Sequence, residues 1–201
     1  MERPVHEELV DLLRQLSDAV ALGRVPDGPE SETFVQWLEE IARHVAAERS
    51  DSGSPGPDAT GLRPHRLLHG LTPVFPRLDA LATGAGSSAF SCSFGPAHEG
   101  PPGLVHGGFV AAAFDIVASM AAAQVHPYVV TRKLRVRYLR PVFLAEELRF
   151  EALAEREEGR SILVSGELRD SSSKRLAAID AEFVVIDATR FNDRRSGTTG
   201  R

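Results

Sequence analysis

Residues 98–125 read HEGPPGLVHGGFVAAAFDIVASMAAAQV, a glycine-rich turn with two histidines that leads into a long apolar stretch. The run from Phe109 to Val125 spans 17 residues and contains Asp115. A membrane-spanning helix needs about 20 apolar residues and tolerates a central carboxylate poorly. A helix that is apolar nearly all round must be covered on most of its sides. This stretch therefore predicts a buried central helix around which the rest of the domain folds.

The segments on either side of this helix have the pattern of β-strands separated by short turns. A hairpin is predicted before the helix, from residues 78–83 and 89–94 with the turn GAGS between them. Four more strand-like segments follow the helix, at residues 129–139, 147–156, 161–169 and 175–186. The order β-β-α-β-β-β-β predicts an α+β protein with the hotdog fold, in which an antiparallel sheet wraps around one long apolar helix.

The first part of the chain has a different character. Apolar residues repeat at helical spacing over residues 5–22 and again from Ser31 to about Glu48. The sequence SDSGSPGPD at 50–58 is typical of a flexible linker. We therefore expect an N-terminal helical extension and linker (1–60), a hotdog domain (61–187) and a disordered tail (188–201). The extension is expected to pack on the core or on a partner subunit.

Composition narrows the function classes. The net charge of −5 and the scattered basic residues argue against a nucleic-acid partner. No secretory signal or membrane span is evident, and the single Cys92 excludes an intramolecular disulfide, so we expect a soluble, cytoplasmic protein. A catalytic thiol at Cys92 or a serine nucleophile at Ser119 lacks the sequence context that such groups need.

The turn at 98–108 has the chemistry of an anion-binding site. The first turn of a helix offers unpaired N–H groups and the positive end of the helix dipole, and glycine lets a ligand approach the backbone. Asp115 lies among apolar residues, where a carboxylate needs a partner or a chemical role. Pairing with an arginine at a subunit interface is the structural alternative. The pattern favours an oxyanion-binding turn beside a placed carboxylate.

The sequence HEGPPGLVHGG, with Asp115 nine residues after His106, resembles the PaaI-like acyl-CoA thioesterases of the hotdog superfamily. The segment TRKLRVRYLRPV at 131–142 is similar to the strand that follows the helix in that family, and the resemblance covers residues 70–187. It implies hydrolysis of an acyl-CoA or acyl-carrier-protein thioester. The implied roles are carbonyl polarisation by the Gly107 N–H, general base or nucleophile at Asp115, water placement by Thr131, and a loop or substrate contact by His106.

The chain departs from this family at one position. Several members carry asparagine six residues before the second histidine, where this chain has Gly100. The polar contact is therefore either missing or supplied by His98, and Gly100 and Gly108 are further candidates for substrate binding. A metal site at His98, Glu99 and His106 has no fourth ligand at suitable spacing. A preorganised N–H stabilises the oxyanion unaided, so we expect no metal or cofactor.

Alternation along residues 131–138 predicts two faces for this strand. Leu134, Val136 and Tyr138 are expected to face the helix, whereas Thr131, Lys133, Arg135 and Arg137 share the other face. This basic stripe is either solvated or a binding surface for the phosphates of coenzyme A, with Arg140 as a further candidate.

Spacing predicts the oligomeric state. Eight residues separate Gly107 and Asp115, which corresponds to about 12 Å along a helix, so one carbonyl cannot contact both within one chain. A shared site therefore needs a homodimer, and a homotetramer stays open. Two rival functions also stay open: a hydratase or dehydratase acting on acyl thioesters, and a non-catalytic acyl-CoA-binding module. The acyl chain and the pathway, in fatty acid metabolism or elsewhere, are not encoded in these motifs.

Overall fold

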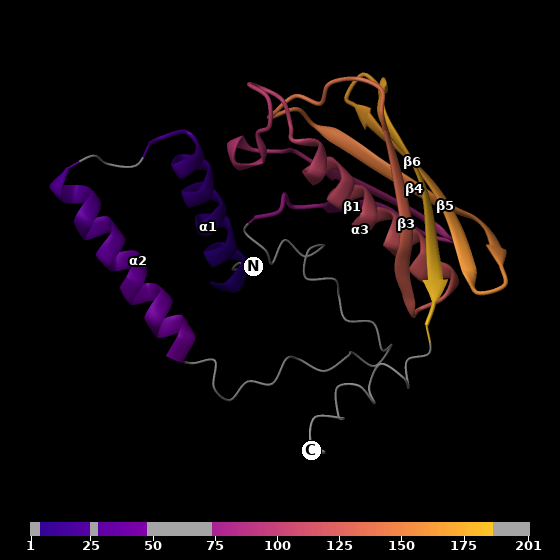
Figure 1. The fold of residues 1–201 in the computed structure, drawn as a ribbon, viewed down its shortest axis with the longest axis horizontal. Helices are drawn as coiled ribbons and strands as arrows, with labels where there is room; N and C mark the ends of the chain where they lie inside the picture. The colour runs from indigo at the N-terminus through magenta and orange to yellow at the C-terminus, as the bar shows by residue number, and fades with distance from the viewer. Residues whose placement is uncertain (1–4, 25–27, 48–73, 187–201) are drawn as a thin grey trace, which may run out of the picture.

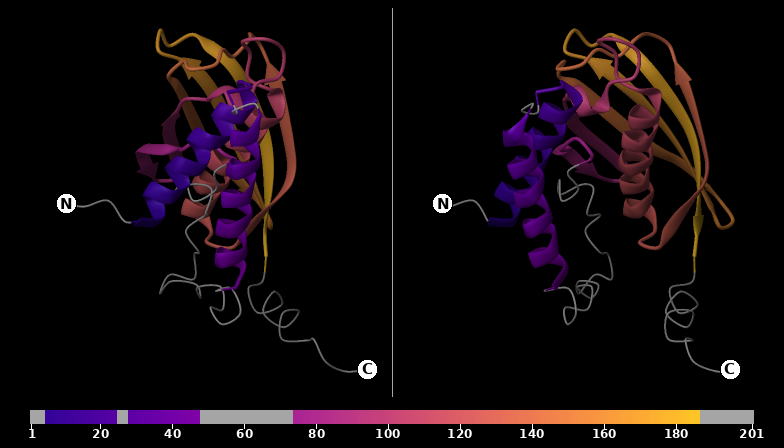
Figure 2. Two further views of the ribbon diagram at one scale, coloured as in Figure 1. Left: turned by 90° about the vertical axis from the view of Figure 1, so that its left-hand side faces the viewer. Right: turned by 60° about the vertical axis from the view of Figure 1, so that its left-hand side comes forward.

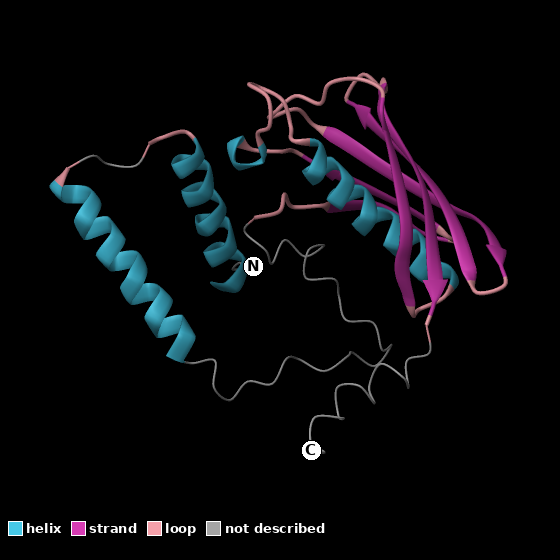
Figure 3. Ribbon diagram, viewed as in Figure 1, coloured by secondary structure: helices cyan, strands magenta, loops and turns pink. Residues whose placement is uncertain are grey.

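The computed structural model of the chain describes residues 5–24, 28–47 and 74–186 (Figure 1). The predicted linker at 50–58 and the predicted tail at 188–201 lie outside the described residues. The described part contains an N-terminal pair of helices and a domain built from one long helix and one sheet (Figure 3).

The sheet has six strands in the order β1-β2-β4-β5-β6-β3, and every neighbouring pair is antiparallel. Their bounds are β1 Asp79–Gly84, β2 Ser87–Cys92, β3 Val129–Tyr138, β4 Leu148–Glu158, β5 Ser161–Asp170 and β6 Arg175–Val185. The sheet curves around helix α3 (Gly107–Val125), as Figure 1 shows. The predicted α+β hotdog fold is confirmed, and each predicted strand is present within a few residues of its expected bounds.

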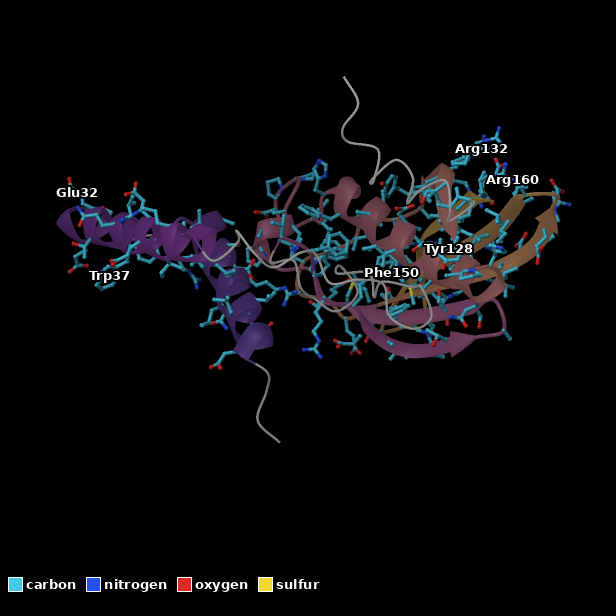
Figure 4. All side chains as sticks on the ribbon, turned by 90° about the horizontal axis from the view of Figure 1, so that it is seen from below. Glu32, Trp37, Tyr128, Arg132, Phe150 and Arg160 are labelled. Atoms are coloured by element: carbon cyan, nitrogen blue, oxygen red, sulfur yellow. The ribbon has the colours of Figure 1, made fainter. Side chains whose placement is uncertain are left out.

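Helix α3 is the centre of the core. Eight of its side chains are buried, and four of these are alanines, whose small size lets the helix lie close to the sheet. Phe114 packs edge-on against Phe150 of β4 with ring centroids 4.9 Å apart, and Figure 4 shows Phe150 between helix and sheet. Burial of one such aromatic side chain contributes about 1.5–3 kcal/mol to folding. Among the described helices α3 alone has the length and hydropathy of a membrane span, a property it shares with core helices.

The N-terminal helices are α1 (Val5–Ala21) and α2 (Pro29–Ala47), which confirm the predicted helical extension. Helix α2 starts two residues before the expected Ser31, because proline is favoured in the first turn of a helix. The Asp18 carboxylate of α1 accepts a hydrogen bond from the Ala97 N–H at 3.0 Å, and Val10 is buried. Helix α1 thus contacts the core, whereas α2 stands apart from the sheet in Figures 1 and 4 and is drawn in front of the domain in the left view of Figure 2, with Trp37 62% exposed.

Candidate active site

The loop before α3 is closed by backbone hydrogen bonds. The His106 N–H donates to the His98 carbonyl at 2.9 Å, and the Gly100 N–H donates to the Leu104 carbonyl at 2.9 Å. Gly100 lies directly against His106, because a Cβ atom at this position would be only 2.9 Å from the His106 Cα. The loop therefore has no space for an asparagine, or any side chain, at position 100.

His106 is the N-cap of α3. Its Nδ1 accepts the Gly108 N–H at 3.0 Å, and its carbonyl accepts the Phe109 N–H at 3.0 Å. Because Nδ1 accepts a hydrogen bond, the neutral ring carries its proton on Nε2. Within the described residues the Gly107 N–H has no acceptor. The start of α3 thus presents one unpaired N–H, flanked by an exposed imidazole.

Gly107 also contacts the strand at the edge of the sheet. The Tyr138 hydroxyl of β3 donates a hydrogen bond to the Gly107 carbonyl at 2.6 Å. A Cβ atom at Gly107 would lie 3.1 Å from the Tyr138 Oη. Sequence reasoning assigned Tyr138 only to the helix-facing side of the strand and missed this contact, although the alternation pattern already pointed the ring at the helix.

Two turns along α3, Asp115 is half-buried and contacts the same strand. The Thr131 Oγ1 donates a hydrogen bond to the Asp115 Oδ1 at 2.7 Å. The face assigned to Thr131 from alternation is wrong. The register of β3 against β6 shifts between Thr131 and Lys133, and this bulge turns Thr131 to the helix-facing side. The predicted pair of Asp115 and Thr131 is therefore in contact within one chain.

His98 lies inside the loop rather than on its surface. Its side chain is 5% exposed and packs edge-on to Phe94 and Phe109. Its Nδ1 accepts the Gly95 N–H at 3.0 Å, and burial lowers the pKa of the imidazole. In this conformation the ring braces the loop, and a substrate contact by His98 stays a prediction.

The basic residues of β3 lie on the outer face of the sheet. Lys133, Arg135 and Arg137 are exposed there, and Arg137 is 3.5 Å from the carboxylate of Asp180 on β6. The Arg140 guanidinium donates to the Arg175 carbonyl at 2.7 Å. Lys133, Arg135 and Arg137 therefore lie on the face of β3 opposite to the one that carries Thr131 and Tyr138, away from Gly107 and Asp115.

Cys92 and Ser119 have structural roles in the described part of the chain. Cys92 is buried, and burial raises the pKa of its thiol to about 12, so that the thiolate is scarce at neutral pH. The Ser119 hydroxyl donates to the Ile116 carbonyl at 2.7 Å within α3. In the part of the chain that the structure describes, no three His, Cys, Asp or Glu side chains gather in a way that could hold a metal ion.

Comparisons with known proteins agree with this architecture. Residues 102–177 match the family model of the thioesterase superfamily. The chain is 33% identical over 82 residues to the acyl-coenzyme A thioesterase THEM4 of Xenopus laevis, a match that covers 41% of this chain and 37% of that protein. The chain thus matches well under half the length of this relative.

One solved structure extends the match to the N-terminal part of the chain. A crystal structure described as that of a thioesterase superfamily protein is 26% identical, with a TM-score of 0.77, and the match covers 91% of this chain and 92% of that one. The PaaI protein of the E. coli phenylacetic acid degradation operon has the same fold, at 16% identity, with a TM-score of 0.53 over 55% of this chain and 80% of that one.

Proposed function

We propose that the hotdog domain of this chain, whose residues 102–177 match the family model of the thioesterase superfamily, hydrolyses acyl-CoA thioesters to a free acid and a thiol. The observation that carries this proposal is the unpaired Gly107 N–H at the start of α3, with the Asp115–Thr131 pair on the same helix. The THEM4 relative, named as an acyl-coenzyme A thioesterase, supports coenzyme A as the thiol. Carrier-protein thioesters present the same reacting group.

The start of α3 provides charge stabilisation. Attack on a thioester places negative charge on the carbonyl oxygen, and a preorganised N–H donor stabilises it by about 3–4 kcal/mol. The Gly107 N–H is the free donor of the first turn, and the helix dipole adds to its effect. The His106 Nε2–H, exposed beside it, is available as a second contact for the thioester.

Asp115 provides the base or the nucleophile. The Thr131 hydroxyl bonds to Oδ1 and fixes the carboxylate plane, which leaves Oδ2 without a protein donor among the described residues. Oδ2 is then free either to accept a proton from a water molecule that attacks the carbonyl or to attack it directly. Both routes end in the same products, so the roles of Gly107 and Thr131 are common to them.

Two chains are needed to complete the site. Gly107 and Asp115 are separated by about 12 Å along α3, more than one carbonyl can bridge. Strand β3 is an edge strand, so its outer edge can pair with a second copy of itself. Antiparallel pairing about a two-fold axis near the middle of β3 would bring the Tyr138 end of one strand beside the Thr131 end of the other. Tyr138 contacts Gly107 and Thr131 contacts Asp115. Gly107 of one chain and Asp115 of the other would therefore lie in the same site, once on each side of the two-fold axis.

The basic outer face of β3 is suited to the phosphates of coenzyme A. Lys133 and Arg135 are exposed on an edge strand, and pairing of two such strands would double the number of cations along one line. Guanidinium groups bind phosphate in a bidentate manner, which favours this assignment over a purely solvated stripe.

The proposal is tested by thiol release from a panel of short, long and aromatic acyl-CoAs. We expect the native protein to hydrolyse at least one of them and Asp115→Ala to lose this activity. Asp79→Ala, which removes an exposed carboxylate from β1, is the matched control and should retain it. Absence of hydrolysis with every substrate would exclude the proposed function, and hydration of an enoyl-CoA without thiol release would assign the site to the rival reaction.

The shared site is tested separately with mixed dimers. A chain that carries Asp115→Ala is combined with a chain that carries Gly107→Pro, which removes the N–H. Each mixed dimer retains one intact pair of half-sites, so activity should return to a fraction of the native value. Absence of recovery in verified mixed dimers would contradict the two-chain geometry.

A further inference from the structure

We propose that Tyr138 is a positioning residue, whose hydroxyl fixes the Gly107–Gly108 peptide and thereby the direction of the Gly107 N–H. This inference rests on the proposed function, because it takes the Gly107 N–H as the donor to the thioester carbonyl. The Tyr138 side chain is 52% exposed at the end of β3 and lies against the first turn of α3.

The peptide between Gly107 and Gly108 is held from both sides. Its carbonyl accepts the hydrogen bond of the Tyr138 hydroxyl at 2.6 Å, and its N–H donates to the His106 Nδ1 at 3.0 Å. A peptide unit is planar and rigid, so one bond on each side leaves it a single orientation. Two side chains from different elements, the loop and the edge strand, thus clamp one amide plane.

This position needs such a clamp. Gly107 and Gly108 are consecutive glycines, the residues with the greatest backbone freedom, and they stand in the first turn, where helical hydrogen bonds to the N–H groups are missing. The Gly107 N–H is separated from the clamped peptide only by the two rotatable bonds at the Gly107 Cα. An N–H stabilises a developing oxyanion well only when its direction is fixed before the reaction.

Gly107 and Tyr138 also fit each other sterically. A Cβ atom on residue 107 would lie 3.1 Å from the Tyr138 Oη and 3.2 Å from its Cζ, closer than ordinary side-chain contacts. The ring therefore occupies the space that a side chain at residue 107 would fill. Partial burial raises the pKa of the Tyr138 phenol, so the hydroxyl stays protonated and able to donate.

The test compares kcat and KM of Tyr138→Phe with those of the native protein. Loss of one hydrogen bond that orients the donor should lower kcat about tenfold. KM should stay within about twofold, because the oriented N–H stabilises the transition state and not the bound substrate. The control is Tyr128→Phe, the same change at the only other tyrosine of the chain, which should leave kcat unchanged. A native kcat in Tyr138→Phe would overturn the inference.

A double variant separates positioning from other effects. In a Gly107→Pro chain the N–H is absent, so Tyr138→Phe should have no further effect on kcat. An equal tenfold loss in both backgrounds would show that Tyr138 acts on something else and would contradict the inference.

A second readout does not depend on hydrolysis. In protein labelled with 15N-glycine, exchange of the Gly108 amide hydrogen should accelerate in Tyr138→Phe and not in Tyr128→Phe, because the clamp holds this peptide. Unchanged exchange would contradict the clamp. A native protein that hydrolyses no thioester would exclude the proposed function, and the exchange rates would still decide whether Tyr138 orders the turn.

Discussion

Thr131 and Asp115 are joined by a 2.7 Å hydrogen bond, and the bulge in β3 is what brings them together. In a regular strand Thr131 would share the outer face with Lys133 and Arg135. The extra residue at Arg132 reverses the alternation, so the hydroxyl points at α3 while the basic side chains stay outside. One irregularity in the ladder thus separates the group that orients the carboxylate from the groups suited to phosphate.

The Thr131 hydroxyl should contribute to the reaction and not to packing. Thr131→Val keeps the shape of the side chain but leaves Asp115 without its donor. We expect kcat to fall about 10- to 100-fold, the effect of one hydrogen bond to a charged group. Thr131→Ser keeps the hydroxyl and should retain most of the activity. Equal activity in the valine and serine variants would remove Thr131 from the proposed site.

Deletion of Arg132 should be tolerated. It removes the extra residue of the bulge, so Thr131 would pair with Phe183 and Lys133 with Glu182 in a regular ladder, as they already do. Thr131 would stay on the helix-facing side, and we expect activity to persist in a folded protein. Deletion of Arg135, from the regular part of the strand, would turn one half of β3 inside out and should unfold the domain. Circular dichroism and thiol release check both outcomes.

The role of the Gly107 N–H can be isolated by two substitutions at one position. Gly107→Pro removes the N–H but suits the first helical position, and the extended backbone of His106 is compatible with a following proline. Gly107→Ala adds a Cβ atom in the same place and keeps the N–H. We expect the proline variant to lose about 100- to 1,000-fold more in kcat than the alanine variant. Similar losses in both would indicate crowding against Tyr138 instead.

The fold was predictable because its signals are local and periodic. The long apolar run of α3 and the alternating strands that follow it fix one helix and one antiparallel sheet, and both are present at the expected residues. The candidate roles of Gly107 and Asp115 came from the resemblance of the motif, and their separation from the rise of a helix; both roles stay predictions. These signals depend only on residues near one another in the chain.

The rest of the site depends on contacts that no short stretch of sequence contains. The bulge at Arg132 is a property of how β3 pairs with β6, 50 residues later, so alternation placed Thr131 on the wrong face. The hydrogen bond from Tyr138 to Gly107 joins residues 31 positions apart. His98 was a candidate for the polar contact that asparagine makes in the family, and sequence alone did not show that Phe94 and Phe109 pack against its ring.

Stability at alkaline pH should depend on Cys92. The pKa of its thiol rises from 9.0 to about 12 on burial, so between these values the unfolded chain loses the proton and the folded chain retains it. The free energy of unfolding should therefore fall with rising pH in this window, by up to about 1.4 kcal/mol per pH unit. Urea denaturation at pH 8, 9 and 10 checks this, with Cys92→Ala as the reference that lacks this component. Parallel pH profiles of the two proteins would be inconsistent with a buried, protonated thiol.

The outer edge of β3, which pairs with no other strand in the described part of the chain, has a consequence for how the protein would be regulated in a cell. In the proposed enzyme each chain contributes one half of each of two sites. The number of active sites therefore depends on the fraction of chains that are paired in dimers. Specific activity would fall on dilution below the dissociation constant of the dimer. In that range the rate of hydrolysis would rise more than proportionally with the concentration of the protein. A defective chain paired with a normal one would leave one of the two sites intact, so activity would fall only in proportion to the share of defective chains.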